Sequence, residues 1–304
     1  MRIVFMGTPD FATASLQKLH DDGHDICGVF TKPDRVQNRG HKLDSSPVKK
    51  LALQLGFPIY QPETLAGDDA AEILRELSPD LIAVVAYGKI LPAEILNIPP
   101  KGCINIHGSI LPKYRGSAPI QRAVLNGEKN TGVTAMYMAQ GMDTGDIISI
   151  KTTDIGEYET SGELFDRLRT MAADLLGETV FNIENGIISR TPQNDAEATY
   201  APPFTKDMSP INWEMTADEI INQIRALNPW PVATTEIDGI SFKVFSAIKS
   251  HKKTDESPGT IIVAGKDGIE IACSDGSVII KELQAPGGKR MKSEDYLRGH
   301  PICL

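Results

Sequence analysis

Several features are absent from this 304-residue sequence, and each absence argues against a class of protein. No apolar run approaches the roughly 20 residues that cross a bilayer, and the N-terminus enters a strand-like pattern without a signal peptide. The four cysteines lie far apart and form no CxxC pair, which argues against a zinc site or a disulfide framework. We therefore expect a cytoplasmic protein with no membrane contact and no metal.

The nucleotide-binding fingerprints are also missing. A short apolar run at residues 3–6 ends at Gly7, and a Thr-Pro-Asp turn then leads into a helix expected at residues 11–21. No G-x-G-x-x-G follows this strand, and no G-x-x-x-x-G-K-[ST] occurs. The opening β-turn-α unit therefore lacks the residues of a dinucleotide site or a P-loop.

Positive charge is scarce overall but gathered in one place. The formal net charge of −9 argues against a protein whose whole surface binds nucleic acid. Residues 32–50, which we call the basic segment, nevertheless hold six basic and two acidic residues. Within them, residues 36–47 show turn signals and little apolar periodicity, so we expect a mobile loop here. Such a loop is either an ordinary solvated segment or a local contact for a polyanion.

The order of the elements predicts two domains. Through residue 190, strands and helices alternate, which is typical of a doubly wound, mostly parallel Rossmann-like α/β sheet. Ala201-Pro202-Pro203 and Ser209-Pro210 then interrupt any continuing element, and a boundary is expected near residues 195–208. Short β segments separated by Asp-Gly turns follow, which indicate a small OB-like β-barrel. We expect a catalytic domain at 1–204 and a β-barrel domain at 205–304.

Three polar side chains are candidates for chemistry. Asn105 and His107 lie two residues apart at the end of an apolar run, so a strand would turn both toward one face. An Asn amide can hold a developing oxyanion, and a His can exchange a proton near neutral pH. Asp143, between two glycines, could orient that imidazole if the two strand ends are adjacent. Together they describe acyl transfer without a covalent enzyme intermediate.

Each of these residues also has a purely structural interpretation. A histidine at the end of an apolar strand is often a satisfied core residue. An aspartate between glycines often belongs to a turn, and an asparagine can simply tie a loop to its strand. From spacing alone, both interpretations stay open.

Longer motifs raise a specific resemblance. Residues 102–116, GCINIHGSILPKYRG, and residues 141–146, GMDTGD, resemble the two catalytic loops of the folate-dependent formyltransferases. Five further motifs occur in the same order as in that family and extend the resemblance over nearly the whole chain. They are FMGTPDFA at 5–12, FTKPDR at 30–35, SPVK at 46–49, VVAYG at 84–88 and NPWP at 228–231.

The resemblance implies a reaction and its residues. The donor would be 10-formyltetrahydrofolate, and the acceptor would be the α-amino group of methionine esterified to initiator tRNA. Asn105, His107 and Asp143 match the family's catalytic residues. The family's folate loop matches Ser109, Ile110, Leu111 and Pro112, with Val85, Ala86 and Tyr87 as a wall against the pterin.

For the tRNA, the resemblance implies contacts from Arg39 and Lys42 in the basic segment and from Lys206 after the linker. Pro203 departs from the family, which often has lysine at this position. Such an enzyme is expected to be a monomer.

Three rival functions remain at this point. A formyltransferase acting on another amine, such as glycinamide ribonucleotide or an amino sugar, would share the catalytic loops. A nicotinamide-dependent oxidoreductase is disfavoured by the missing glycine fingerprint. A non-catalytic RNA-binding module would leave Asn105, His107 and Asp143 without a role.

Overall fold

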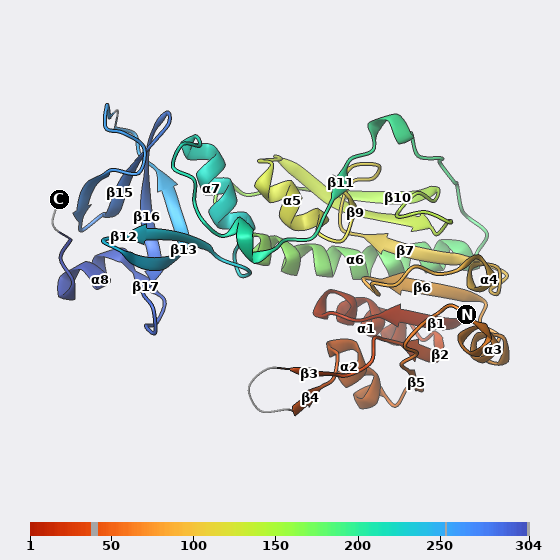
Figure 1. The fold of residues 1–304 in the computed structure, drawn as a ribbon. Coiled ribbons are helices and arrows are strands. Elements are labelled where there is room, and N and C mark those ends of the chain that lie inside the picture. The colour runs from red at the N-terminus through yellow and green to blue at the C-terminus, as the bar shows by residue number, and fades with distance from the viewer. Residues whose placement is uncertain (38–41, 253, 303–304) are drawn as a thin grey trace. The chain divides into compact units, whose positions relative to one another are not determined.

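The computed structural model describes residues 1–37, 42–252 and 254–302 (Figure 1). The chain divides into two compact units. The first unit consists of Met1–Pro119, Thr131–Thr153 and Phe165–Ala201, and the second of Ile120–Asn130, Asp154–Leu164 and Pro202–Leu304. The last passage of the chain from the first unit to the second, between Ala201 and Pro202, lies within residues 195–208, where the prolines predict a boundary.

The first unit is built on a seven-stranded sheet with the order β10-β9-β7-β6-β1-β2-β5. Neighbouring strands from β5 to β7 are parallel, and β9 then pairs antiparallel to β7. The strands are β1 (Arg2–Gly7), β2 (Asp25–Phe30), β5 (Ile59–Tyr60), β6 (Leu81–Val85), β7 (Cys103–His107), β9 (Asn130–Tyr137) and β10 (Ile147–Asp154). The predicted parallel-dominated α/β fold is confirmed.

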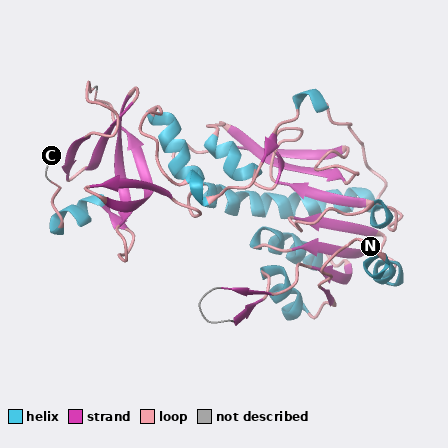
Figure 2. Cartoon of the chain, viewed as in Figure 1, coloured by secondary structure: helices cyan, strands magenta, loops and turns pink. Residues whose placement is uncertain are grey.

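Helices follow the strands in alternation, as Figure 2 shows. A short 3-10 helix, η1 (Asp10–Ala12), precedes the first of them. The helices are α1 (Thr13–Asp21), α2 (Pro47–Leu55), α3 (Asp68–Leu77), α4 (Ala93–Leu96) and α6 (Ser161–Glu184). Apolar residues recur at helical spacing along α2, α3 and α6, so the sequence itself predicts helices in these segments.

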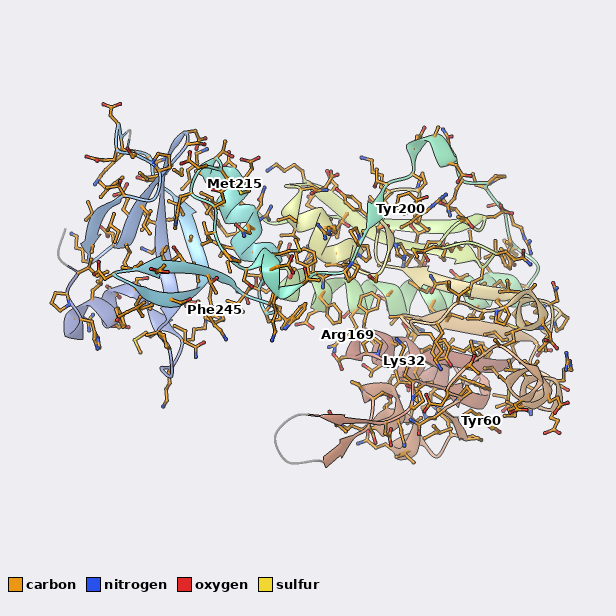
Figure 3. The ribbon with its side chains drawn as sticks, viewed as in Figure 1. Lys32, Tyr60, Arg169, Tyr200, Met215 and Phe245 are labelled. Carbon is orange, nitrogen blue, oxygen red and sulfur yellow. The ribbon has the colours of Figure 1, made fainter. Side chains whose placement is uncertain are left out.

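The central strands are buried because helices cover both faces of the sheet. Every residue of β6 and β7 is buried, as the continuous apolar sequence of β6 predicts. On one face, Leu74 of α3 and Ile95 of α4 belong to the same core cluster as Val4 and Val84. At the edge of the sheet, Tyr60 stacks on a phenylalanine of β2 with ring centroids 4.9 Å apart (Figure 3).

One local prediction was wrong. Residues 36–47 were expected to form a mobile loop, but β3 (Arg35–Gln37) and β4 (Lys42–Asp44) pair antiparallel, with Arg35 opposite Asp44. Strands of three residues are too short to show an apolar alternation, so the pairing left no signal in the sequence. Residues 38–41, between them, lie outside the described residues.

The second unit carries the β-rich segments predicted after the linker. Its antiparallel sheet has the order β12-β13-β16-β15-β14, and β17 pairs with β16. Its strands are β12 (Ala233–Ile237), β13 (Ile240–Lys249), β14 (Ile261–Gly265), β15 (Gly268–Cys273), β16 (Gly276–Gln284) and β17 (Met291–Lys292). Its helices are η3 (Lys206–Met208), α7 (Ala217–Ala226) and α8 (Ser293–Gly299), while α5 (Pro119–Leu125) begins at the last residue of the first unit.

The start of helix α7 is fixed by two capping residues. The side chain of Thr216 accepts a hydrogen bond from the Glu219 backbone N–H, and the Glu219 carboxylate accepts one from the Thr216 N–H. This reciprocal capping box satisfies donors that a helix N-terminus otherwise leaves open. Among the described residues, no helix combines the length and the apolar character of a membrane span.

Leu74→Ala tests the core of the first unit. We expect the free energy of unfolding of this unit to fall by about 2–5 kcal/mol, because the substitution leaves a cavity in a fully buried position. Leu53→Ala is the matched control, since Leu53 of α2 is 62% exposed and should change the value by less than about 0.5 kcal/mol. Urea unfolding followed by circular dichroism measures both, and equal effects would contradict the assignment.

Candidate active site

Strand β7 carries the first two candidate residues on one face of the sheet. Asn105 lies opposite Met136 in β9 and His107 opposite Thr134, and residues paired across a sheet point to the same side. Asn105 is 9% exposed and His107 is 6% exposed. In the part of the chain that the structure describes, the side-chain amide of Asn105 makes no hydrogen bond. That amide is therefore an uncommitted donor beside the imidazole.

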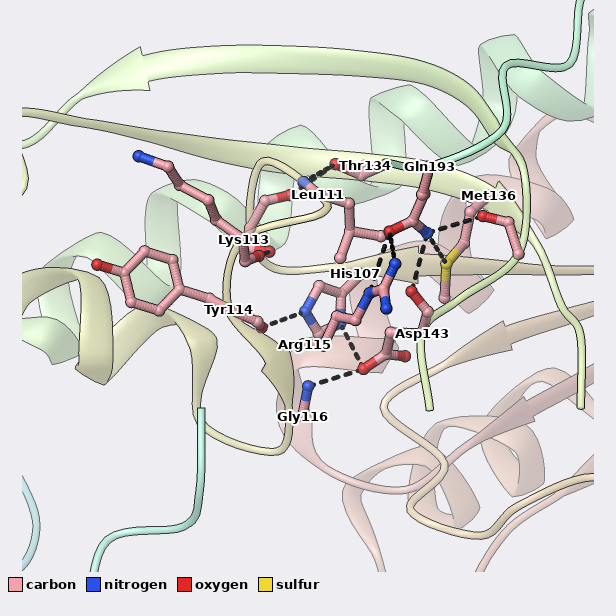
Figure 4. Close-up of polar contacts among 12 residues, drawn as sticks. His107, Leu111, Lys113, Tyr114, Arg115, Gly116, Thr134, Met136, Asp143 and Gln193 are labelled. Atoms are coloured by element: carbon pink, nitrogen blue, oxygen red, sulfur yellow. Dashed lines mark hydrogen bonds and ion pairs between the residues drawn. The ribbon is translucent and has the colours of Figure 1, made fainter. Parts of the chain in front are cut away.

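The imidazole of His107 lies between a carbonyl and a carboxylate (Figure 4). Its Nε2 is 2.9 Å from the Tyr114 carbonyl oxygen, which only accepts, so Nε2 carries a proton. Its Nδ1 is 3.6 Å from Oδ2 of Asp143, beyond direct hydrogen-bond distance. Nδ1 is therefore the nitrogen that is left to exchange a proton, with a negative charge beside it.

Asp143 reaches His107 by a route that the sequence does not reveal. Because β9 runs antiparallel to β7, its last residue, Tyr137, pairs with Ile104 near the start of β7. The ends of β7 and β9 are not adjacent, and the loop of residues 138–146 returns over the sheet to bring Asp143 to His107. The Asp143 backbone has a φ of 55°, a left-handed conformation that Asp tolerates better than most residues.

The Asp143 carboxylate is held by a backbone donor. Oδ2 accepts a hydrogen bond of 2.8 Å from the Gly116 N–H. Gly116 has a φ of 124°, and a Cβ on it would lie 2.8 Å from the carbonyl oxygen of Ala201. Gly116 belongs to β8 (Arg115–Gly116), which pairs with β11 (Tyr200–Ala201). This close pairing requires glycine and fixes the donor that orients Asp143.

The predicted folate loop follows directly after His107. The hydroxyl of Ser109 donates to the Lys113 carbonyl at 2.6 Å, and Thr134 Oγ1 donates to the Ser109 carbonyl at 2.6 Å. The Leu111 N–H completes this network by donating to Thr134 Oγ1 at 3.2 Å. Ser109 is fully buried, whereas Ile110 and Pro112 are half-buried. The loop is thus rigidly tied to β9, with the half-buried Ile110 and Pro112 on its apolar edge.

The predicted pterin wall follows β6. Val85 ends that strand, and Ala86, with a φ of 47°, is exposed. Tyr87 is 1% exposed, and its ring belongs to the same core cluster as Leu74. Burial raises the pKa of the Tyr87 hydroxyl to about 12. The ring therefore serves the core, and the Tyr87 carbonyl accepts a hydrogen bond of 3.1 Å from the Thr8 hydroxyl.

A cavity of about 300 Å³ lies beside the first residues of β7, at the end of the strand away from His107. None of the residues predicted from the sequence lines it. Burial raises the pKa of the Cys103 thiol, on its wall, to about 12, so this group is not a thiolate at neutral pH. The cavity is lined by Ala93, Leu96, Asn97, Gly102, Cys103, Tyr137, Met138, Ala139, Gln140 and Arg190.

The residues predicted to contact tRNA are distributed along the chain. Lys206 begins η3 in the second unit and is exposed. Lys42 begins β4, and Arg39 lies outside the described residues. Within the described ranges, no three His, Cys, Asp or Glu side chains gather in a way suited to a metal ion.

Two residues that contact the site loops were not singled out from the sequence. Gln193 hydrogen-bonds the backbone around Asp143, and Arg115 hydrogen-bonds Gln193. Arg115 lies inside the first family motif, but Gln193 lies in none of the family motifs and just before the expected domain boundary. Only the fold brings the two together.

Comparisons with known proteins decide the family. Residues 1–180 match the formyl transferase family, and residues 203–301 match the formyl transferase C-terminal domain. Methionyl-tRNA formyltransferase of Trichlorobacter lovleyi is 46% identical over 303 residues, covering 100% of this chain and 95% of the relative. That of Alkaliphilus oremlandii is 47% identical over 302 residues, covering 99% and 97%. This chain belongs to the methionyl-tRNA formyltransferase family.

Membership in this family confirms the resemblance stated from the motifs and makes the chain a group-transferring enzyme. A solved N-formyltransferase of Helicobacter canadensis, in complex with folinic acid and dTDP-3-aminofucose, shares the fold with a TM-score of 0.67. It is 21% identical, and the match covers 91% of this chain and 98% of the neighbour. The methionyl-tRNA formyltransferase family thus accounts for both the α/β unit and the antiparallel unit.

Gly116→Ala tests how Asp143 is held. We expect turnover to fall by about 10-fold or more, because the new Cβ displaces the N–H that orients the carboxylate. Gly186→Ala is the control, since Gly186 also has a positive φ, 69°, but no described heavy atom would contact its Cβ. Steady-state kinetics of both variants measure the effect, and wild-type turnover in Gly116→Ala would refute the orienting role.

Proposed function

We propose that this protein transfers the formyl group of 10-formyltetrahydrofolate to the α-amino group of methionyl initiator tRNA by direct attack. The observation that carries the proposal is the His107–Asp143 pair beside an uncommitted Asn105 amide, in a chain 46% identical to a methionyl-tRNA formyltransferase. The N-formyltransferase with folinic acid supports a folate donor on this fold. The relatives' name supports the tRNA acceptor.

The reaction begins with the neutral amine. A free α-amino group has a pKa of about 7.7–8.0, so only modest deprotonation is required. The amine nitrogen attacks the formyl carbon, and the carbonyl electrons move to oxygen to form a tetrahedral intermediate. The C–N10 bond of the folate then breaks. The amine loses one proton, N10 gains one, and the products are formylmethionyl-tRNA and tetrahydrofolate.

The proposed roles follow from the available atoms. The Asn105 amide donates to the oxyanion without exchanging protons. The Nε2–H of His107 donates to the Tyr114 carbonyl throughout the reaction. Nδ1 therefore takes up or releases the transferred proton and donates to the developing charge. The Asp143 carboxylate, 3.6 Å away, stabilises the imidazolium that forms.

The folate and the tRNA are bound by different sets of residues. Ser109, Ile110, Leu111 and Pro112, with the backbone after Val85, form the folate side of the site. Arg39, Lys42 and Lys206 contact the tRNA, a role that rests on the family resemblance and on the local excess of positive charge. We assign catalysis to residues 1–204 and tRNA contact to residues 205–304 together with the basic segment. The enzyme works as a monomer in the cytoplasm, where charged tRNA is used.

An amino sugar or glycinamide ribonucleotide is the alternative acceptor. The sugar N-formyltransferase neighbour, at 21% identity, supports the fold alone. Relatives at 46% and 47% identity over nearly the whole chain favour methionyl-tRNA.

An acceptor assay tests the proposed function. The protein is mixed with 10-formyltetrahydrofolate and methionyl initiator tRNA, and formylmethionine is measured by mass after the ester is hydrolysed. We expect formylation of the methionyl-tRNA and none of glycinamide ribonucleotide or a dTDP-amino sugar. Formylation of either small amine in preference to the tRNA would overturn the acceptor.

His107→Ala and Asp143→Ala test the catalytic roles. We expect each to lower kcat by about 10² to 10³ while tRNA affinity stays unchanged, because His107→Ala removes a donor to the oxyanion and Asp143→Ala removes the charge that stabilises the imidazolium. His251→Ala, at an exposed position of the second unit, is the control and should retain wild-type kcat. Near-normal turnover in either site variant would remove that residue from the mechanism.

A further inference from the structure

The side-chain amide of Gln193 links the loop that carries Asp143 to β8, the strand whose Gly116 N–H orients the Asp143 carboxylate (Figure 4). Its Nε2 donates to the Asp143 carbonyl at 2.8 Å and to the Gly145 carbonyl at 2.7 Å. Both N–H groups of the amide are thus used on one loop. The two carbonyls flank a single residue, so the amide holds the backbone on both sides of the turn.

Arg115 completes the arrangement from the other side. Oε1 of Gln193 accepts from Arg115 Nε at 3.2 Å and from Nη2 at 2.8 Å, and Nη2 also donates to Asp195 at 2.7 Å. Arg115 is only 2% exposed, so its charge depends on these acceptors. Carbonyls on one side and a guanidinium on the other leave a single sensible orientation of the amide.

The segment that carries Gln193 is fixed at both ends within the first unit. Thr191 exchanges two backbone hydrogen bonds, of 2.8 and 2.9 Å, with Ile147, the first residue of β10. Thr199 accepts the Arg115 N–H at its carbonyl, at 2.8 Å, and the Tyr114 N–H at its hydroxyl, at 2.9 Å. Asp195–Glu197 (η2) lies between these anchors. Gln193 is therefore held in place independently of the loop that it contacts.

The loop needs such a clamp for two reasons. Asp143 has a left-handed backbone, which costs a non-glycine residue energy and persists only where the surroundings enforce it. The loop also returns over the sheet from Tyr137, with Gly141 and Gly145 on either side of Asp143. Glycines widen the range of backbone conformations, so external hydrogen bonds must select one.

We infer that Gln193, supported by Arg115, is a positioning residue for formyl transfer that acts by holding Asp143 beside Nδ1 of His107. The inference rests on the proposed function and deepens it. Gln193 does not touch the reacting atoms. It determines where the Asp143 carboxylate lies, together with the Gly116 N–H on the other side.

Gln193→Glu separates the clamp from mere packing. The carboxylate keeps the size of the side chain and the contact with Arg115, but it donates nothing to the two carbonyls. We expect kcat to fall by about 10- to 100-fold, the cost of a misplaced catalytic group, with KM for both substrates within about threefold of wild type. Gln193→Met, an apolar side chain of similar volume, should lower kcat to a similar extent and shows the effect should Gln193→Glu fail to fold.

Gln223→Glu is the matched control. In the second unit, Gln223 Nε2 also donates to two backbone carbonyls, those of Met208 and Pro210, at 2.9 Å each. Gln223→Glu removes these two hydrogen bonds, so it should lower the melting temperature of the protein but leave kcat within about twofold of wild type. A fall in kcat equal to that of Gln193→Glu would make the effect a general consequence of lost stability and overturn the inference.

A double-mutant cycle with Asp143→Asn tests the route of the effect. If Gln193 acts through Asp143, Gln193→Glu should cost less than about threefold in the Asp143→Asn background. Effects that multiply fully would overturn the inference, as would wild-type kcat in Gln193→Glu.

Hydrogen exchange provides a readout that does not depend on activity. Amides of residues 138–146 should exchange faster in Gln193→Glu and unchanged in Gln223→Glu. A wild-type protein that does not formylate methionyl-tRNA would refute the proposed function and leave this measurement to decide the clamp. Unchanged exchange would refute the clamp alone.

Discussion

The approach of a carboxylate to a buried imidazole is the constraint on which the site depends. Nδ1 of His107 and Oδ2 of Asp143 are 3.6 Å apart, close enough for charge stabilisation and too far for a direct hydrogen bond. In the proposed mechanism, this distance leaves Nδ1 free to exchange a proton with the substrate while the carboxylate stabilises the imidazolium. Each neighbouring element contributes to keeping it: β7 carries the imidazole, Tyr114 fixes its other nitrogen, and Gly116 fixes the carboxylate.

Backbone groups perform much of the work in this site. The Tyr114 carbonyl and the Gly116 N–H both belong to the loop and short strand that follow β7, so the sequence motif supplies the imidazole and its supports together. The hydroxyl of Ser109 is used inside the same loop. A loop whose side chains are satisfied internally keeps its shape before a ligand arrives, which lowers the ordering cost of binding.

Much of the fold was predictable because its signals are local. The buried run of β6, the apolar periodicity of α3 and α6, and the Asp-Gly turns of the second unit each act over a few residues. The hairpin of β3 and β4 was not predictable, since strands of three residues carry no alternation. Nor was the burial of the Tyr87 ring, which depends on helices elsewhere in the chain.

The sequence by itself determined the chemistry on offer: an Asn and a His two residues apart on a strand, and an Asp in a glycine-flanked turn, within motifs of one family. The tertiary structure decided how they meet. Because β9 is antiparallel to β7, Asp143 arrives by a returning loop, and Gln193, some 50 residues later in the chain, holds that loop. Strand direction and long-range hydrogen bonds depend on the packing of distant segments, which no local spacing encodes.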